Sequence, residues 1–396
     1  MVIGNGAPNT ARLEQIATDL GAVSFGVTST APFGESLAVL REHRATGMSG
    51  PLHFTYDEPE TATDVSRTFP WARSIVVFAH GYLADSHQPA RTGPLVGRFA
   101  TDDQYSALRH IAGGVAEELG SAGARAEVLI DDNRLVDRAA AARAGAGWLG
   151  KSTMLLAPGH GPWLLLGSVV TDADLETTSP MRRTCGSCVA CIPACPTGAI
   201  SPHGLDARLC ISTWLQAPGA IPRWIRPVIG RRIYGCDDCL TSCPPGFPAL
   251  DRAGALEHVL SFSELLGMSD QDLIDRFTWF YIPQRETRFL RRNLLVAAGN
   301  SEEADAVGPI LDHFTHRSSL VRGHAYWALA RSLGGQAWTT LRRRHAFETV
   351  PDAVDELEKA MLMLRIPAGG QEEPGDPGGA GPARRRSRAQ PASFRP

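Results

Sequence analysis

All eight cysteines of this chain lie between Cys185 and Cys243, and this clustering limits what the chain can be. The N-terminal sequence has no basic stretch followed by an apolar core, so we expect no signal peptide and a cytoplasmic protein. Thiols stay reduced in the cytosol, so a clustered set is typical of metal binding rather than of disulfides. We therefore expect this segment to hold metal.

The spacing of the cysteines indicates which metal centre to expect. The first run is Cys185-x2-Cys188-x2-Cys191-x3-Cys195-Pro196, the second is Cys236-x2-Cys239-x3-Cys243-Pro244, and Cys210 lies alone between them. The first run has the spacing of bacterial ferredoxins, in which three thiolates hold one 4Fe–4S cluster and the fourth reaches another. By this crossover rule one cluster is held by Cys185, Cys188, Cys191 and Cys243, and the other by Cys195, Cys210, Cys236 and Cys239.

Zinc is the alternative metal, because paired C-x2-C motifs also build zinc sites. A C-x2-C-x2-C-x3-C-P run is poorly suited to one tetrahedral ion. The sequence therefore favours two 4Fe–4S clusters over zinc.

Outside this segment the composition is that of an ordinary globular protein. The 396 residues are 43% apolar and 20% charged, with a net charge of −3, and their number suggests two or three domains. No run of about 18 apolar residues is present, so we expect no transmembrane helix and no membrane partner. We expect a monomer.

Strand and helix patterns alternate before the cysteines. Apolar β-branched runs predict strands at 23–27, 74–79, 126–130, 153–156 and 163–170, and helical spacing predicts helices at 11–22, 102–119 and 135–144. This alternation predicts a layered α/β domain over residues 1–175. The cysteine-rich domain then covers residues 176–255.

The pattern becomes helical after the cysteines. Helices are predicted at 265–277, 290–298, 306–314, 321–333 and 354–364. Successive helices of this length are similar to a short HEAT-type solenoid, so we expect a helical region over residues 256–366. Residues 367–396 are rich in Gly, Pro and Arg and are expected to be disordered.

Four features occur in a fixed order along the chain. They are Asp131 after a predicted strand, the Gly145-x-Gly147-Trp148-x-Gly150-Lys151 turn, the cysteine pattern, and a helix start at Arg292-Asn293. Together, over roughly residues 10–365, they resemble the epoxyqueuosine reductase family. The resemblance implies a nitroreductase-like α/β domain that binds cobalamin, a ferredoxin-like domain with two 4Fe–4S clusters, and HEAT-like helices that bind a tRNA anticodon stem-loop.

The reaction implied by the resemblance is the last step of queuosine synthesis. The epoxide oxygen of epoxyqueuosine is removed at the wobble position of tRNA, which takes two electrons and two protons. Low-potential clusters and a corrin-bound cobalt can deliver such electrons, whereas side chains cannot. A low-potential electron donor, whose identity the sequence does not give, is therefore a required partner.

Asp131 is the proton donor that the resemblance implies. Burial has to raise its pKa if the carboxyl is to hold a proton near neutral pH. The alternative is that Asp131 caps the following helix, a role that Asp132 or Asn133 could fill equally well.

The resemblance also implies the cobalamin contacts. They are Arg98, Asp131, Lys151, Ser152, Thr153, Ser212, Thr213 and Trp214. The sequence contains no Asp-x-His-x-x-Gly motif, which would supply a replacement axial histidine, so we expect the cobalamin to be base-off.

The case for RNA binding is local, because the overall charge is slightly negative. Arg285, Arg288 and Arg292 recur at helical spacing, which predicts one basic face suited to phosphates. With Arg291 they form the expected tRNA site, and Arg317 and Arg322 could extend it. The alternative is that these are ordinary solvated arginines.

Two other functions are compatible with parts of the sequence. A reductive dehalogenase-like enzyme would also combine cobalamin with two clusters but would act on a small molecule, and a ferredoxin-type carrier would only move electrons. Cobalamin binding separates the carrier from both enzymes, and dependence on tRNA separates the two enzymes.

Overall fold

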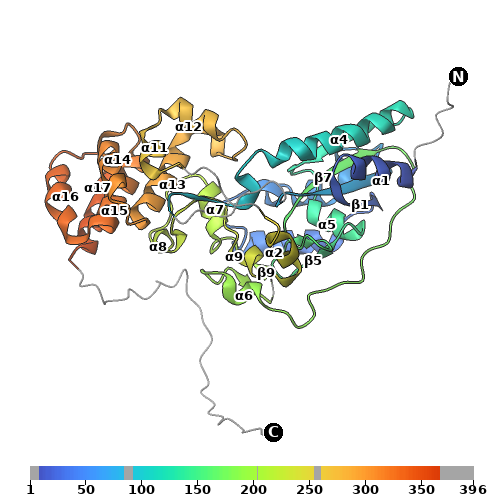
Figure 1. Cartoon of the computed structure of the whole chain (residues 1–396), viewed down its shortest axis with the longest axis horizontal. Helices are drawn as coiled ribbons and strands as arrows, with labels where there is room; N and C mark the ends of the chain where they lie inside the picture. The colour runs from blue at the N-terminus through green and yellow to red at the C-terminus, as the bar shows by residue number, and fades with distance from the viewer. Residues whose placement is uncertain (1–8, 84–91, 203, 254–259, 366–396) are drawn as a thin grey trace, which may run out of the picture.

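The computed structural model describes residues 9–83, 92–202, 204–253 and 260–365. Figure 1 shows an α/β domain at one end, a bundle of helices at the other, and the cysteine-bearing segment between them. The predicted disordered tail lies outside the described residues. None of the described helices combines the length and the apolar character needed to cross a bilayer.

The α/β domain is built on one four-stranded sheet. Its strands are β1 (Ala22–Ser29), β2 (Ser74–Gly81), β7 (Leu164–Thr171) and β4 (Ala126–Ile130), in the order β1-β2-β7-β4. Every neighbouring pair is antiparallel. These are the strands that the apolar runs predict, and the strand expected at 153–156 is the short β6 (Leu155–Leu156), paired with β5 (Trp148–Leu149).

Strand β2 is buried along its whole length because helices cover both faces of the sheet. Val76 and Phe78 pack with α1 (Thr10–Asp19) and α4 (Gln104–Ser121). Ile75 and Val77, which point the other way, pack with α5 (Asp137–Arg143). A strand that is buried on both faces has apolar residues at successive positions instead of alternating ones. This explains the sequence SIVVFAHG of β2.

Short elements make up the cysteine-bearing segment. They are α6 (Cys191–Ala194), β8 (Ile200–Ser201), β9 (Gly204–Leu205), α7 (Ile211–Gln216), α8 (Arg226–Ile229), β10 (Arg232–Tyr234), α9 (Asp238–Thr241) and α10 (Phe247–Leu250). Strand β10 pairs in parallel with β3 (Leu95–Val96) of the first part of the chain. The α/β domain also contains α2 (Gly34–Thr46) and α3 (Pro59–Thr63), which the sequence patterns do not predict.

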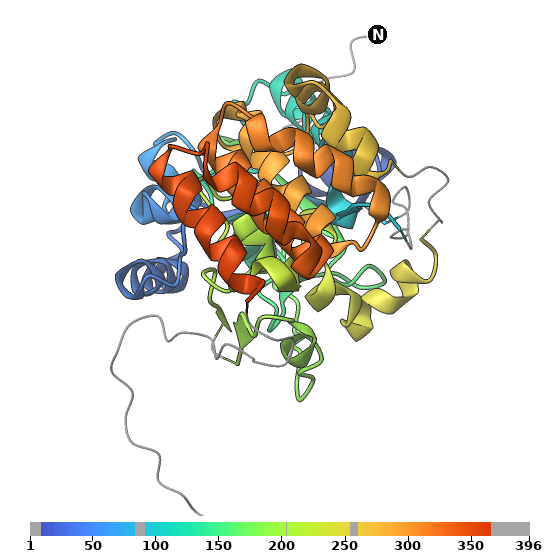
Figure 2. The same ribbon diagram turned by 90° about the vertical axis from the view of Figure 1, so that its left-hand side faces the viewer.

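The C-terminal helices lie close to their predicted positions, with two differences (Figure 2). The helices are α11 (Phe262–Gly267), α12 (Asp270–Arg276), α13 (Thr287–Asn300), α14 (Val307–Asp312), α15 (Ser319–Leu333), α16 (Trp338–His345) and α17 (Pro351–Met363). The single helix predicted at 265–277 is two helices, because the Ser269 hydroxyl accepts the Asp272 N–H and starts a new helix there. Helix α16 is not predicted.

The core of the helical region extends into the cysteine-bearing segment. Ile211, Leu215 and Ile233 are buried in one cluster with Leu294 of α13 and Ala325 of α15. The stretch after Cys210 therefore packs as part of the helical bundle.

The expectation of one exposed arginine face is corrected by the structure. Arg292 is 0% exposed and donates to the carbonyl oxygens of Trp214 and Ala217. Arg291 is also buried and pairs with Asp270 at 2.6 Å. Helix α13 is enclosed by its neighbours, so helical spacing alone does not reveal which side meets solvent.

The remaining arginines of that prediction lie in different environments. Arg322 is buried in an ion pair with Glu348 at 2.7 Å. Arg285 is exposed but precedes α13, and its guanidinium donates to the carbonyls of Thr278 and Phe280. Arg288 and Arg317 are exposed, although Arg288 pairs with Glu286 and Arg317 pairs with Asp270 at 3.0 Å.

Candidate active site

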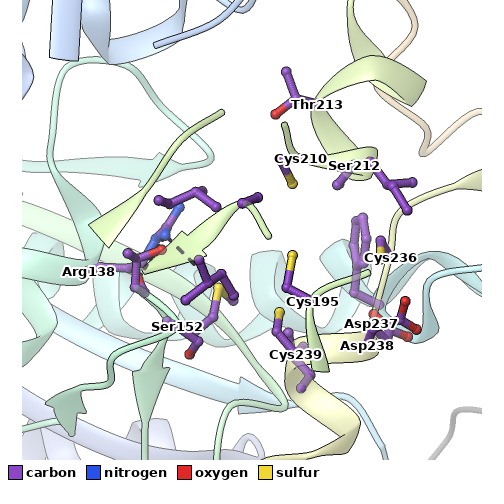
Figure 3. Close-up of a pocket in the computed structure, with 18 of the residues that line it drawn as sticks. Arg138, Ser152, Cys195, Cys210, Ser212, Thr213, Cys236, Asp237, Asp238 and Cys239 are labelled. Atoms are coloured by element: carbon purple, nitrogen blue, oxygen red, sulfur yellow. Dashed lines mark hydrogen bonds between the residues drawn. The ribbon is translucent and has the colours of Figure 1, made fainter. Parts of the chain in front are cut away.

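A cavity opens where the α/β domain meets the cysteine-bearing segment (Figure 3). Its volume is about 370 Å³. Leucines 155, 164, 165 and 166 line it from the sheet side, and four cysteines line it from the other side. The cavity therefore brings together segments that are far apart in the sequence.

The four cysteines at the cavity are the quartet expected to hold the second cluster. Figure 3 shows Cys195, Cys210, Cys236 and Cys239 around one space. Burial, together with the neighbouring thiols, raises the pKa of Cys239, and burial raises the pKa of Cys236 to about 12. Burial acts in the same direction on Cys195, but hydrogen bonding with Thr197 and backbone N–H groups leaves its pKa lowered. Such closely grouped thiols are suited to a shared metal centre.

The other four cysteines form a second group. Burial, together with the Cys185, Cys191 and Cys188 thiols, raises the pKa of Cys243 to about 11. Lys151 and Cys185 are neighbours as well, because the Lys151 backbone N–H donates to the Cys185 sulfur at 3.4 Å. The structure thus brings together the two quartets that the spacing predicts. In the described part of the chain, no three thiol, carboxylate or imidazole groups converge tightly enough to hold a single metal ion.

Asp131 lines the cavity directly after β4. Its φ of 50° is unusual for a residue with a side chain, and such strain is concentrated at functional sites. By surface area the residue is exposed, because it faces the open cavity. Enough protein surrounds it, however, that desolvation raises the pKa of its carboxyl; Asp137 raises this pKa further and Arg138 opposes the shift. A carboxyl with a raised pKa can hold a proton for transfer into the cavity.

The alternative role for Asp131, capping the next helix, is not observed. Helix α5 starts at Asp137 with Val136 as its N-cap residue. Asp132 makes the local contacts instead, because its carboxylate accepts from the backbone and the side chain of Arg134. These hydrogen bonds lower the pKa of Asp132, so the two adjacent carboxyls have opposite pKa shifts.

Four hydroxyl residues of the expected cobalamin site line the cavity. They are Ser152, Thr153, Ser212 and Thr213. Thr153 has a φ of 64°, and its carbonyl accepts from the Arg138 guanidinium at 2.9 Å. This contact joins the turn after β5 to the helix that follows Asp131.

The other three expected contacts are not among the residues that line this cavity, so their role in binding cobalamin stays a prediction. The Lys151 ammonium donates to the carbonyls of Gly186 and Cys188 at 2.8 and 3.0 Å, so it braces the first quartet. The Trp214 indole N–H donates to the Arg208 carbonyl at 2.7 Å. Arg98 is buried, and its backbone N–H donates to Asp237 at 2.7 Å.

Sequence reasoning missed several cavity residues, and three of them carry polar groups that bear on the chemistry. Tyr105, Arg138 and Asp237 all line the cavity. Burial raises the pKa of Asp237 to about 6, against the opposing effect of the Arg98 N–H. The position of Asp237 between Cys236 and Cys239 could have indicated that it lies at the site. Nothing in the sequence around Tyr105 distinguishes that residue from other helix residues.

Comparison with known proteins identifies the class. Residues 184–246 match the family model of a 4Fe-4S double cluster binding domain. Fold and cavity together define an iron–sulfur oxidoreductase of mixed helix and sheet structure, with a 4Fe-4S cluster-binding domain.

The relatives identify the family. An epoxyqueuosine reductase of Xanthomonas campestris is 31% identical over 346 residues, which are 81% of this chain and 95% of that protein. A crystal structure of epoxyqueuosine reductase with an epoxyqueuosine-modified tRNA stem loop is 27% identical, with a TM-score of 0.80 over 90% of this chain and 98% of that one. The Bacillus subtilis enzyme, solved with an aspartate catalytic loop swung out of the active site, is 26% identical, with a TM-score of 0.78 over 89% and 98% of the two chains. This chain belongs to the epoxyqueuosine reductase family, as its motifs predict.

Proposed function

We propose that this enzyme removes the epoxide oxygen of epoxyqueuosine at the wobble position of tRNA. The epoxide takes up two electrons and two protons, and an alkene and water are formed. One observation carries the proposal: a thiol quartet suited to a 4Fe–4S cluster and a carboxyl with a raised pKa line the same cavity. The site therefore combines an electron source with a proton source.

The domain organisation supports this chemistry. We propose a nitroreductase-like α/β domain over residues 1–175, a ferredoxin-like domain with two clusters over residues 176–255, and a HEAT-like helical region over residues 256–366. Two quartets of thiols fit two 4Fe–4S clusters, because each cluster takes four thiolate ligands. Cys195, Cys210, Cys236 and Cys239, which would hold the second cluster, line the cavity.

The polar and apolar groups that line the cavity support our proposal that a corrinoid binds there. When bound, cobalamin supplies a cobalt centre that accepts electrons and reacts with carbon. The hydroxyls of Ser152, Thr153, Ser212 and Thr213 suit the amide groups at the edge of a corrin, and the leucines of the sheet side exclude water.

Of the arginines expected to bind tRNA, two remain candidates for contact with its phosphates. Arg288 is in the first turn of α13, and Asp270 accepts from both Arg291 of the next turn and Arg317, which places Arg317 beside α13. The Arg317 side chain is 84% exposed. We propose that Arg288 and Arg317 bind phosphates of the tRNA stem, with Arg285 positioning the turn before α13.

Changing both Arg288 and Arg317 to alanine should raise the apparent KM for tRNA. Each lost phosphate contact should also lower the slope of log affinity against log salt by about 1, because fewer counterions are released. Arg12→Ala serves as the control, since Arg12 is an exposed, ion-paired arginine on α1 at the other end of the molecule. Wild-type salt dependence in the double variant would place the RNA surface elsewhere.

The proposed reaction itself is tested with the full chain. After anaerobic reconstitution with iron, sulfide and cobalamin, the enzyme is given dithionite and epoxyqueuosine-containing tRNA, and the nucleosides are analysed by mass spectrometry. We expect queuosine to replace epoxyqueuosine. Cobalamin binding without turnover on tRNA would favour a small-molecule reductase, and failure to bind cobalamin would favour an electron carrier.

A further inference from the structure

The two thiol quartets differ in their exposure to solvent. The quartet of Cys195, Cys210, Cys236 and Cys239 faces the cavity. In the other quartet Cys188 is exposed, and so are its neighbours Ser187 and Val189. An electron that arrives from outside the protein therefore meets the first quartet at the surface, and the second quartet lies next to the reaction.

Exposed apolar side chains lie beside this surface quartet. Val189 is 49% exposed and Leu149 is 50% exposed. They come from different segments, but Lys151 joins these segments through its ammonium contacts with the carbonyls of Gly186 and Cys188. Leu149 and Val189 thus belong to one area of surface around Cys188.

The charged side chains of the two segments that carry this area are all basic. From 138 through 171 and from 177 through 205 the chain contains no Asp or Glu, whereas Lys151, Arg182 and Arg183 are present. Arg182 and Arg183 are both exposed, and neither forms an ion pair with a carboxylate in the described parts of the chain. Arg183 lies over the Trp148 ring at 5.6 Å, next to Leu149. We define Leu149, Lys151, Arg182, Arg183 and Val189 as the entry face.

We propose that the entry face docks an acidic, low-potential one-electron carrier protein. This inference rests on the proposed function, because it requires a cluster in the first quartet. Redox partners associate through small interfaces, and opposite charges steer their encounter. A basic rim with a small apolar centre above a redox group is suited to that kind of contact. A cationic or RNA partner would gain no binding energy from the exposed Leu149 and Val189 side chains.

The electrons balance over two encounters. In each one the carrier loses one electron and the cluster at Cys188 gains one electron. Two encounters supply the two electrons that removal of the epoxide oxygen requires, and the two protons come from the cavity and solvent. No bond forms between the carrier and the enzyme.

The test uses the reconstituted full chain and reduced flavodoxin, an acidic flavin carrier, in anaerobic stopped-flow absorbance without tRNA. The variant carries Arg182→Glu and Arg183→Glu. We expect the second-order rate of cluster reduction to fall about tenfold or more at low salt, since electrostatic steering contributes factors of 10 to 10³ to association. The difference should shrink at high salt, where charges are screened. An unchanged rate, or a decrease that salt does not affect, would overturn the proposal.

A matched control is available on α16. Arg342 and Arg343 are also a tandem exposed pair, far from the cysteines in Figure 1. Changing both to glutamate makes the same change in net charge and should leave the flavodoxin rate within twofold of wild type. A decrease equal to that of the Arg182 and Arg183 variant would show an effect of net charge alone and would contradict the entry face.

Dithionite separates this proposal from the proposed function. It is a small reductant that needs no docking face, so it should reduce the clusters of the variant as fast as those of wild type. The cluster assignment itself would be refuted if the reconstituted wild-type protein contained no iron and showed no absorbance band that dithionite bleaches. Variant clusters that form and accept electrons from dithionite, but take them slowly from flavodoxin, support the entry face.

Discussion

Turnover should fall by about 10² to 10⁴-fold when Asp131 is replaced by asparagine, because an amide cannot deliver a proton and general acids contribute factors of this size. Asparagine keeps the shape of the side chain and tolerates a positive φ, so the strained backbone after β4 should persist. The measurement is single-turnover conversion of epoxyqueuosine in tRNA by the reconstituted variant. Normal turnover with cluster and cobalamin content intact would end the assignment.

The pH dependence provides a second readout for Asp131. Burial raises the pKa of its carboxyl, so the protonated form persists to higher pH than that of an ordinary aspartate. Wild-type turnover should decrease as pH rises through this raised pKa, and the Asp131→Asn variant should lose that step. A pH profile with the same step in both proteins would assign the titration to another group.

Stability changes in the opposite direction from activity. The folded state binds the Asp131 proton more tightly than the unfolded chain does, so this carboxyl disfavours the folded state once pH rises above its unfolded pKa. Asp131→Asn should therefore be at least as stable as wild type at neutral pH. Asp132→Asn is the control: the Arg134 guanidinium lowers the pKa of Asp132, so its carboxylate stabilises the folded state at neutral pH and its loss should cost stability.

Local patterns were sufficient for much of the fold. The run at Ala126–Ile130 has the bounds that its apolar residues predict, and the two thiol quartets follow from spacing. The break at Ser269 was also readable, since Ser-x-x-Asp is a helix start that the prediction of one helix at 265–277 overlooked. The antiparallel order of the sheet was not, because it depends on pairings between distant segments.

The site residues show the same division. Asp131 and the four hydroxyl residues follow short motifs, and these residues line the cavity. Lys151 has the charge expected of a ligand-binding residue, but its ammonium is used by two backbone carbonyls of the cysteine loop. Arg291 and Arg292 fail for a similar reason, because a helical wheel gives spacing and not the neighbours that bury a side chain.

Replacing Cys210 with serine should remove the second cluster and leave the first. Cys210 precedes α7, apart from the C-x2-C runs, so no neighbouring thiol can take its place. Iron and labile sulfide should fall from about eight of each per chain to about four, as expected when one of two 4Fe–4S clusters is lost. Turnover should fall below detection, because the remaining cluster lies at the surface and not at the cavity.

The matched control for this variant is Cys188→Ser, which should remove the surface cluster and keep the one at the cavity. Helix α7 is held independently of the metal, because Asn293 donates to the Leu215 carbonyl at 2.7 Å and Arg292 donates to the carbonyls of Trp214 and Ala217. The Cys210 variant should therefore fold and keep the surface cluster, which its electron paramagnetic resonance spectrum can show after reduction. Loss of both clusters in the Cys210 variant would mean that they assemble together, and one zinc without labile sulfide in wild type would refute the cluster assignment for both quartets.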